Sequence, residues 1–148
     1  MILVKQAGVY VNILNCRLKK YLAEVFRQNN VNLTAEQYLV MDTLWNEGTL
    51  TQQEIAYIIQ KDKNSVTQFV DNLEKKGLVT RSVSKDDRRV NNIVVTEQGM
   101  AMKDSTKQLA IETMNKALAG IPEEDVLTFV DVLKKICDNI DDFGTKIG

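Results

Sequence analysis

A single short β-rich stretch interrupts a chain whose apolar residues otherwise recur every three to four positions, and this pattern limits the fold more than any other feature. The stretch comprises residues 78–83 and 90–95, which are rich in β-branched side chains, with the charged segment 84–89 between them. Such runs predict a hairpin with a polar tip. A length of 148 residues is typical of one domain. We therefore expect a mostly α (α+β) fold in which residues 1–148 form a single domain.

Two capping boxes predict the starts of helices ahead of the hairpin. Thr34 with Gln37, and Thr51 with Glu54, place a hydroxyl three residues before a side chain that can reach back to the cap. Each pair satisfies two backbone amides that a helix start otherwise leaves unpaired. The expected helices run from the first box to about residue 47 and over residues 52–60.

A further helix should follow almost at once, because Asp62 is a favourable N-cap and helical spacing continues to Lys76. Gly77 is a natural stop, and the hairpin begins directly after it. Two helices joined by a tight turn and followed by a charged hairpin form a winged helix-turn-helix. In this motif the second helix enters the major groove, and the hairpin tip reaches the backbone or minor groove. We assign residues 34–96 to this part, called the head below.

The remaining helices carry apolar seams that a head of this size cannot bury. In the last one, apolar residues from Val126 to Ile140 keep helical spacing for more than three turns. Packing such seams against a twofold-related copy is the economical arrangement, so we expect an obligate homodimer. Cys16 and Cys137 are interpreted as buried packing thiols. The helices are expected over residues 9–26, from Thr96 to Gly120 and from Pro122 onward, and the helical dimerisation region over residues 1–30 and 97–148.

The composition excludes most catalytic and metal-binding chemistry. Without histidine, the chain has no imidazole base, no Ser/His or Cys/His nucleophile pair and no His ligand for zinc. Its two cysteines are too few and too far apart for a disulfide scaffold or a zinc knuckle, which favours a reducing compartment. No apolar run approaches the ~20 residues that span a bilayer. We expect a soluble cytoplasmic protein that is not an enzyme and has no cofactor, metal site or membrane partner.

The outward face of the helix after Asp62 is polar, while Val66, Phe69 and Val70 are spaced to hold its inner face. Asn and Gln can pair with adenine edges and Lys can contact guanine or phosphate, so this face suits base reading. An ordinary solvated helix face is the other interpretation. The expected DNA-binding residues of this helix are Lys63, Asn64, Ser65, Thr67, Gln68 and Asn72.

Charge is distributed unevenly beneath the net value of -1. Residues 51–92 hold eight basic and six acidic side chains, whereas residues 93–148 hold six basic and ten acidic ones. Positive charge is therefore concentrated where phosphate contact is expected, and the C-terminal helices are acidic.

Several motifs together resemble those of the MarR-type (multiple-antibiotic-resistance regulator) family, and the resemblance covers essentially the whole chain. As a set they are specific, although each alone would be weak. One departure is that Gln60 stands where the family often has glycine, and Lys61 where it often has an apolar turn residue. The matching segments are Gln53-Glu54-Ile55-Ala56, Asn64-Ser65-Val66-Thr67, the run from Val70 to Val79, Asp86-Asp87-Arg88-Arg89 and the run from Val95 to Gly99.

The resemblance implies a homodimeric transcription regulator that binds double-stranded DNA at a pseudo-palindromic operator. Asp87 and Arg89 match the family's Asp-x-Arg positions in the wing, so Arg89 is expected in or beside the minor groove, with Asp87 orienting it. Lys85 and Arg88 are expected as further wing contacts. A hairpin tip that is charged only for solubility is the alternative.

The family also implies a repressor that a small amphipathic or aromatic ligand releases. Tyr10, Tyr38, Met41 and Trp45 could line a ligand cleft, but aromatics at helical spacing are more often ordinary core. Peroxide-sensing relatives carry a cysteine early in the first helix, where this chain has Tyr10. The alternative function is a winged-helix protein-interaction module without specific DNA readout, which would tolerate loss of Arg89 and Gln68.

Overall fold

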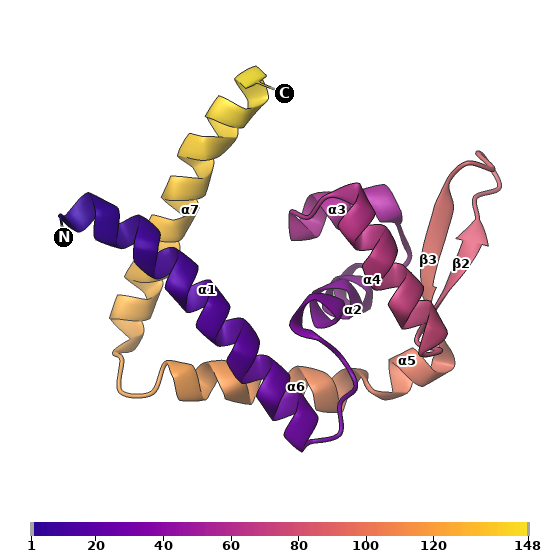
Figure 1. Cartoon of the computed structure of the whole chain (residues 1–148), viewed down its shortest axis with the longest axis horizontal. Coiled ribbons are helices and arrows are strands. Elements are labelled where there is room, and N and C mark those ends of the chain that lie inside the picture. Colours follow the sequence, from indigo (N-terminus) through magenta and orange to yellow (C-terminus); the bar gives the residue numbers. More distant parts are fainter. Residues whose placement is uncertain (1, 148) are drawn as a thin grey trace. The chain divides into compact units, whose positions relative to one another are not determined.

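The computed structural model describes residues 2–147, and their side chains as far as residue 141. The chain divides into two compact units, one ending at Thr113 and the other beginning at Met114. Its elements combine helices with one small antiparallel sheet, which confirms the expected mostly α, winged-helix fold (Figure 1). They are α1 (Leu3–Gln28), α2 (Ala35–Glu47), β1 (Leu50–Thr51), α3 (Gln52–Ile59), α4 (Lys63–Lys75), β2 (Val79–Val83), β3 (Asn91–Val95), α5 (Glu97–Ala101), α6 (Lys103–Ala117) and α7 (Glu123–Ile147).

Both capping boxes form as expected and fix where α2 and α3 begin. The Thr34 hydroxyl accepts from the amide of Gln37 at 3.1 Å, and the Gln37 side chain accepts from the amide of Thr34 at 3.2 Å. Thr51 and Glu54 repeat this arrangement, with both distances 3.1 Å. The two helices are therefore started by local hydrogen bonds that the sequence alone specifies.

The turn between α3 and α4 requires a left-handed residue, and Gln60 supplies it with φ 57°. A non-glycine residue seldom adopts this conformation, which explains why glycine is common at this position in the family that the sequence resembles. At the other end of α4, Gly77 has φ 77°, and the Leu78 amide donates to the Leu73 carbonyl at 3.0 Å. The expected stop is thus confirmed, with Gly77 at the C′ position that follows the C-cap of α4.

The sheet has the order β1–β3–β2, and both pairings are antiparallel. The expected hairpin is formed by β2 and β3, with Val79 opposite Val95 and Val83 opposite Asn91. Strand β1 was not expected, because its two residues are too few to show an alternating pattern. Leu50 lies opposite Ile93, so this short strand ties the start of α3 to the wing.

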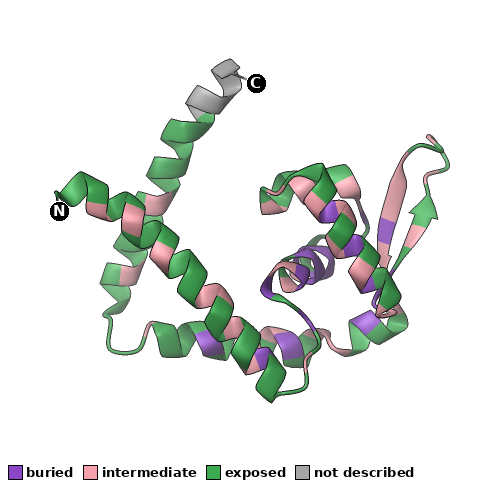
Figure 2. Ribbon diagram, in the orientation of Figure 1, coloured by how far each residue is buried: buried purple, intermediate pink, exposed green. Residues whose placement is uncertain are grey.

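The buried core lies almost wholly between Leu33 and Ile93. Helices α2 and α4 contribute most of it, and Figure 2 shows buried positions gathered on these helices. Phe26, at the end of α1, is the one buried hydrophobic residue described outside that span. Burial of these side chains stabilises the fold by about 25 cal/mol per Å² of apolar surface that is removed from water. The side chains with no exposed surface include Phe26, Val40, Met41, Ile55, Val66, Val70, Leu73, Val79 and Ile93.

Two expected helix boundaries are wrong. Helix α1 starts at Leu3 rather than near residue 9. The prediction missed this first part because Leu3 and Val4 are exposed, so the sequence there shows no pattern of burial. The helix expected from Thr96 to Gly120 is split at Met102 into α5 and α6. The indole of Trp45 donates to the Gly99 carbonyl at 3.2 Å, an acceptor that an unbroken helix would use for the amide of residue 103.

The apolar seam of α7 is exposed in the single chain, with Phe129 44% and Ile140 62% exposed. Cys16 on α1 and Cys137 on α7 are also exposed, so the expectation that both thiols are buried is wrong for the chain by itself. Both cysteines lie on helices whose side chains are mostly exposed, and a sequence pattern cannot tell which chain covers such a face.

Candidate nucleic-acid interface

Helix α4 is held by an acidic N-cap at one end and an apolar face along its length. The Asp62 carboxylate accepts from the Ser65 amide at 2.8 Å and from the Ser65 hydroxyl at 2.9 Å. These hydrogen bonds, the backbone one first, lower the pKa of Asp62. Val66, Val70 and Leu73 have no exposed surface. The helix therefore presents its opposite face to solvent in a fixed rotation.

Three of the residues expected to read DNA point into solvent without intramolecular partners. Lys63, Asn64 and Gln68 are exposed, and none of their side chains makes a hydrogen bond or ion pair within the described part of the chain. Unpaired donors and acceptors on a rigid helix can form hydrogen bonds to base edges and phosphates of DNA.

The other three expected residues are more enclosed. Ser65 is engaged with Asp62, as described above. The Thr67 hydroxyl donates to the Lys63 carbonyl at 3.0 Å and accepts from Gln52 Nε2 at 2.9 Å. Asn72 is half-buried. The polar face of α4 thus divides into an unpaired group near its start and a group occupied by contacts within the head.

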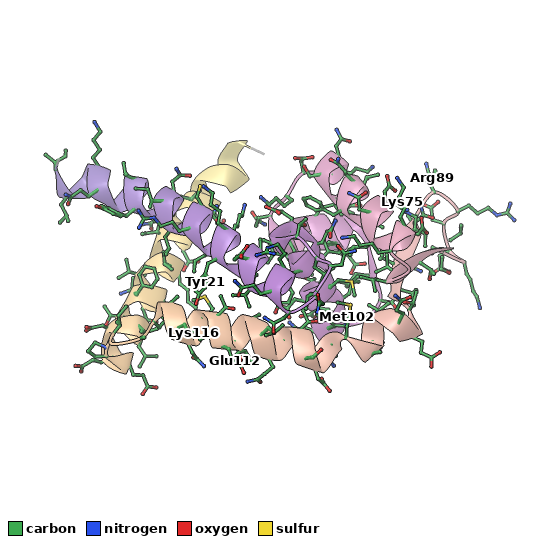
Figure 3. All side chains as sticks on the ribbon, turned by 60° about the horizontal axis from the view of Figure 1, so that its bottom comes forward. Tyr21, Lys75, Arg89, Met102, Glu112 and Lys116 are labelled. Atoms are coloured by element: carbon green, nitrogen blue, oxygen red, sulfur yellow. The ribbon has the colours of Figure 1, made fainter. Side chains whose placement is uncertain are left out.

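The wing tip holds its arginine through a neighbouring carboxylate. Asp87 Oδ1 accepts from the Arg89 amide at 3.0 Å and from Arg89 Nε at 3.2 Å, and Oδ2 accepts from Arg89 Nη2 at 3.4 Å. The amide, followed by the guanidinium, lowers the pKa of Asp87. The Arg89 side chain, labelled in Figure 3, stays 91% exposed, and Lys85 and Arg88 are also exposed. Asp87 therefore orients a guanidinium that remains available to an external group.

The recognition-helix and wing residues share one concave surface of about 570 Å³. Lys63 and Thr67 of α4, Arg89 of the wing, and Gln53 at the start of α3 all line it. Three of the predicted DNA-binding residues, two from the helix and one from the wing, therefore line one surface.

Arg81 makes contacts that the sequence did not reveal. It counted toward the basic charge of the head, but its guanidinium contacts Asp71 at 2.6 Å and Glu74 at 2.9 Å, both on α4. Its Nε donates to Gln52 of α3 at 3.1 Å. Arg81 thus connects β2 with both helices of the motif and holds the wing against α4. The signal that could have indicated it is a pair of acids three residues apart on α4, facing a basic residue of the following strand.

The residues named for a ligand cleft do not form one group. Met41 and Trp45 are buried in the core, and Tyr38 packs against it, with ring centroids 5.3 Å from Phe26 and 6.4 Å from Trp45. Tyr10 is 62% exposed and lies outside that core. Tyr38, Met41 and Trp45 therefore serve the packing of α2.

The described residues contain no cluster of three or more Cys, Asp or Glu side chains that is arranged to hold a metal ion. Within residues 2–147, every helix is too short or too polar to cross a bilayer.

Comparisons with known proteins relate this part of the chain to a family. The family model described as MarR family matches residues 33–90. The HTH-type transcriptional regulator MhqR of Bacillus subtilis (strain 168) is 28% identical over 114 residues, which are 77% of this chain and 79% of that protein.

Solved structures show the same fold. BpsR of Bordetella bronchiseptica, from a study of the regulation of its DNA binding by 6-hydroxynicotinic acid, superimposes with a TM-score of 0.83 at 20% identity, covering 93% of this chain and 97% of that one. A mutant MarR from E. coli complexed with operator DNA gives 0.81 at 22% identity, covering 92% and 99%. Members of the matched family are transcription regulators. The chain is thus similar to members of the MarR family.

Proposed function

We propose that the protein is a homodimeric transcription regulator that binds a pseudo-palindromic operator in double-stranded DNA. The observation that carries the proposal is the polar start of α4, where the side chains of Lys63, Asn64 and Gln68 have no hydrogen bond or ion pair within the described part of the chain. It lies next to a wing whose Arg89 is oriented by Asp87. In the E. coli MarR structure with the same fold, the protein is bound to operator DNA.

In this proposal α4 enters the major groove. Asn64 and Gln68 contact base edges, and Lys63 contacts guanine or a phosphate. The wing lies over the adjacent minor groove, whose negative potential attracts the Arg89 guanidinium. Lys85 and Arg88 contact neighbouring phosphates. Ser65, Thr67 and Asn72 lie on the same face and act mainly by holding the helix, since Ser65 and Thr67 are occupied and Asn72 is half-buried.

The proposal of a homodimer is supported by the exposed apolar surface outside the head. Val11 and Leu14 of α1, and Phe129, Val130 and Ile136 of α7, are each at least 40% exposed in the single chain. A second copy that covers these faces would set two heads about one helical turn of DNA, roughly 34 Å, apart. We accordingly assign residues 34–96 to DNA reading, and residues 1–30 and 97–148 to dimerisation. A light-scattering mass equal to one chain at micromolar concentration would overturn this assignment.

We further propose that the regulator is a repressor released by a small amphipathic or aromatic ligand, and that it acts in the cytoplasm, where its DNA target lies. Support comes from BpsR, whose DNA binding is regulated by 6-hydroxynicotinic acid. Adding small aromatic acids to the preformed protein–operator complex should release DNA for at least one of them. Transcription from an operator-bearing promoter should fall when the protein is present.

Selection of bound sequences from random DNA tests the central proposal. We expect two inverted half-sites with centres about 10 base pairs apart, because each recognition helix of a dimer reads one half-site. Binding should weaken steeply with salt through counterion release. Enrichment of no sequence, together with binding that tolerates loss of both Arg89 and Gln68, would favour a protein-interaction module instead.

A further inference from the structure

The C-terminal end of α4 is tied to the loop between α1 and α2 by one ammonium group. Lys76 is the C-cap of α4, and its Nζ donates to the Asn32 carbonyl at 2.9 Å and to Gln37 Oε1 at 2.7 Å. Gln37 is 5% exposed, and the same Oε1 accepts from the Thr34 amide that completes the capping box of α2. One side-chain oxygen thus serves the start of α2 and the end of the recognition helix.

The loop that Lys76 contacts is firmly attached to the end of α1. The Val31 amide donates to the Phe26 carbonyl at 2.9 Å, and Asn29 Nδ2 donates to the Val25 carbonyl at 2.8 Å. Phe26 has no exposed surface, and Val31 packs against the core. A displacement at the end of α1 would therefore move the Asn32 carbonyl, and with it one of the two acceptors that hold Lys76.

The charge of Lys76 is satisfied by neutral oxygens alone. No carboxylate pairs with it within the described part of the chain, and burial lowers its pKa. Its neighbour Lys75, labelled in Figure 3, is exposed and makes no such contact. An ammonium group needs acceptors at hydrogen-bonding distance and angle, whereas an apolar side chain needs only contact. The arrangement therefore fixes the position of the end of α4 relative to the loop.

We propose that Lys76 is a positioning residue that sets the orientation of α4 relative to the end of α1, and thereby the discrimination between operator and other DNA. This inference rests on the proposed function, because it assigns Lys76 a share in operator reading without contact to DNA. The contacts of Lys76 lie on the side of α4 that faces the α1–α2 loop, while Lys63, Asn64 and Gln68 face solvent.

The test compares Lys76→Met with Lys75→Met, two adjacent substitutions that remove the same charge. Affinity is measured for the selected operator and for a random duplex of equal length, at several salt concentrations. Lys76→Met should lower the ratio of the two affinities about tenfold, the loss expected for one or two hydrogen bonds to a charged group. Lys75→Met should change both affinities by the same factor. Lys76→Arg, which keeps the donors, should recover most of the ratio.

Hydrogen exchange in the free protein provides a readout that does not involve DNA. Lys76→Met should speed exchange of the Val31 and Leu78 amides together, whereas Lys75→Met should leave both unchanged. Equal behaviour of the two Met variants in this measurement and in the affinity ratio would overturn the inference. If the unaltered protein fails to select any operator, the proposed function fails, and coupled exchange at Val31 and Leu78 still decides whether Lys76 ties α4 to the loop.

Discussion

The head and the arm helices, as we call α1 and α7, satisfy their apolar residues in different ways. Residues 33–93 contain nearly all the buried hydrophobic side chains, and α2 and α4 share one core. Helix α7 has no buried residue among those described, although its apolar residues follow the helical repeat as regularly as those of α4. Figure 2 shows the same contrast between buried head positions and exposed arm positions. Regular amphipathic spacing therefore shows that a face will be covered, but it does not show by which chain.

The strongest way to break this contrast is to place charge in the α7 seam. Phe129→Glu combined with Ile136→Glu should convert the dimer to single chains and lower operator affinity by about a hundredfold or more, because a second head then no longer binds at high effective concentration. Light scattering gives the mass, and gel shift gives the affinity.

The head should stay folded in this double variant, since its core does not include α7. Asp131→Asn, an exposed position on the same helix, is the control and should remain a dimer. A double variant that kept the mass of two chains would show that the seam is not the dimer interface.

A substitution on the outer face of α4 should affect DNA reading without affecting either region's packing. Gln68→Ala should weaken operator binding by about 1–3 kcal/mol, the cost of losing one base-reading side chain, and should leave binding to random DNA nearly unchanged. Gln108→Ala, at an exposed position on α6, is the matched control. Equal weakening on both duplexes would indicate that Gln68 contacts phosphate, and no weakening on either would indicate that it contacts nothing.

Within the head, Arg81 tests whether wing and recognition helix form one unit. Arg81→Met keeps the stem but removes the contacts to Asp71 and Glu74, and should lower the free energy of unfolding by about 1–2 kcal/mol, less than for a fully buried pair because both acids are partly exposed. Arg88→Met removes an exposed charge of the wing and should change stability by under about 0.5 kcal/mol. Urea denaturation measures both, and equal midpoints would contradict the role given to Arg81.

The sequence predicted most of the head because its signals are local. Thr34, Thr51 and Asp62 cap helices by accepting from the backbone amide three residues ahead, and Gly77 ends α4 by its own conformation. Features that depend on distant residues escaped it. The break at Met102 accompanies the Trp45 indole, 54 positions from Gly99, and β1 exists only as a partner of β3.

The candidate site shows the same limit. Periodicity identified the outward face of α4, and the family resemblance identified Asp87 and Arg89 in the wing. Neither could show that Thr67 is occupied by Gln52, that Arg81 is neutralised by two acids, or that Lys76 turns toward the α1–α2 loop. Each of these contacts joins elements that are separated in the chain, so only the tertiary arrangement assigns the side chain its role.

The smallest expected effect concerns Tyr38, which packs on Phe26 where α1 joins the head. Burial, followed by the charge of Asp42 and a hydrogen bond to it, raises the pKa of Tyr38 from 10.0 to about 12. Between these values the unfolded chain has lost the phenolic proton and the folded chain has kept it, so the stabilisation is complete below pH 10 and disappears as pH rises through about 12. Tyr38→Phe should remove this dependence. The unfolding free energies of the unaltered protein and of Tyr38→Phe are measured near pH 9 and again near pH 11, and the difference between them is taken at each pH. The titration of the lysines, which both proteins share, cancels in this difference. That difference should shift in favour of the Phe variant at the higher pH. A constant difference for Tyr38→Phe would mean that the junction between α1 and the head opens before the phenol titrates, and that this part of α1 belongs energetically with the arm rather than with the head.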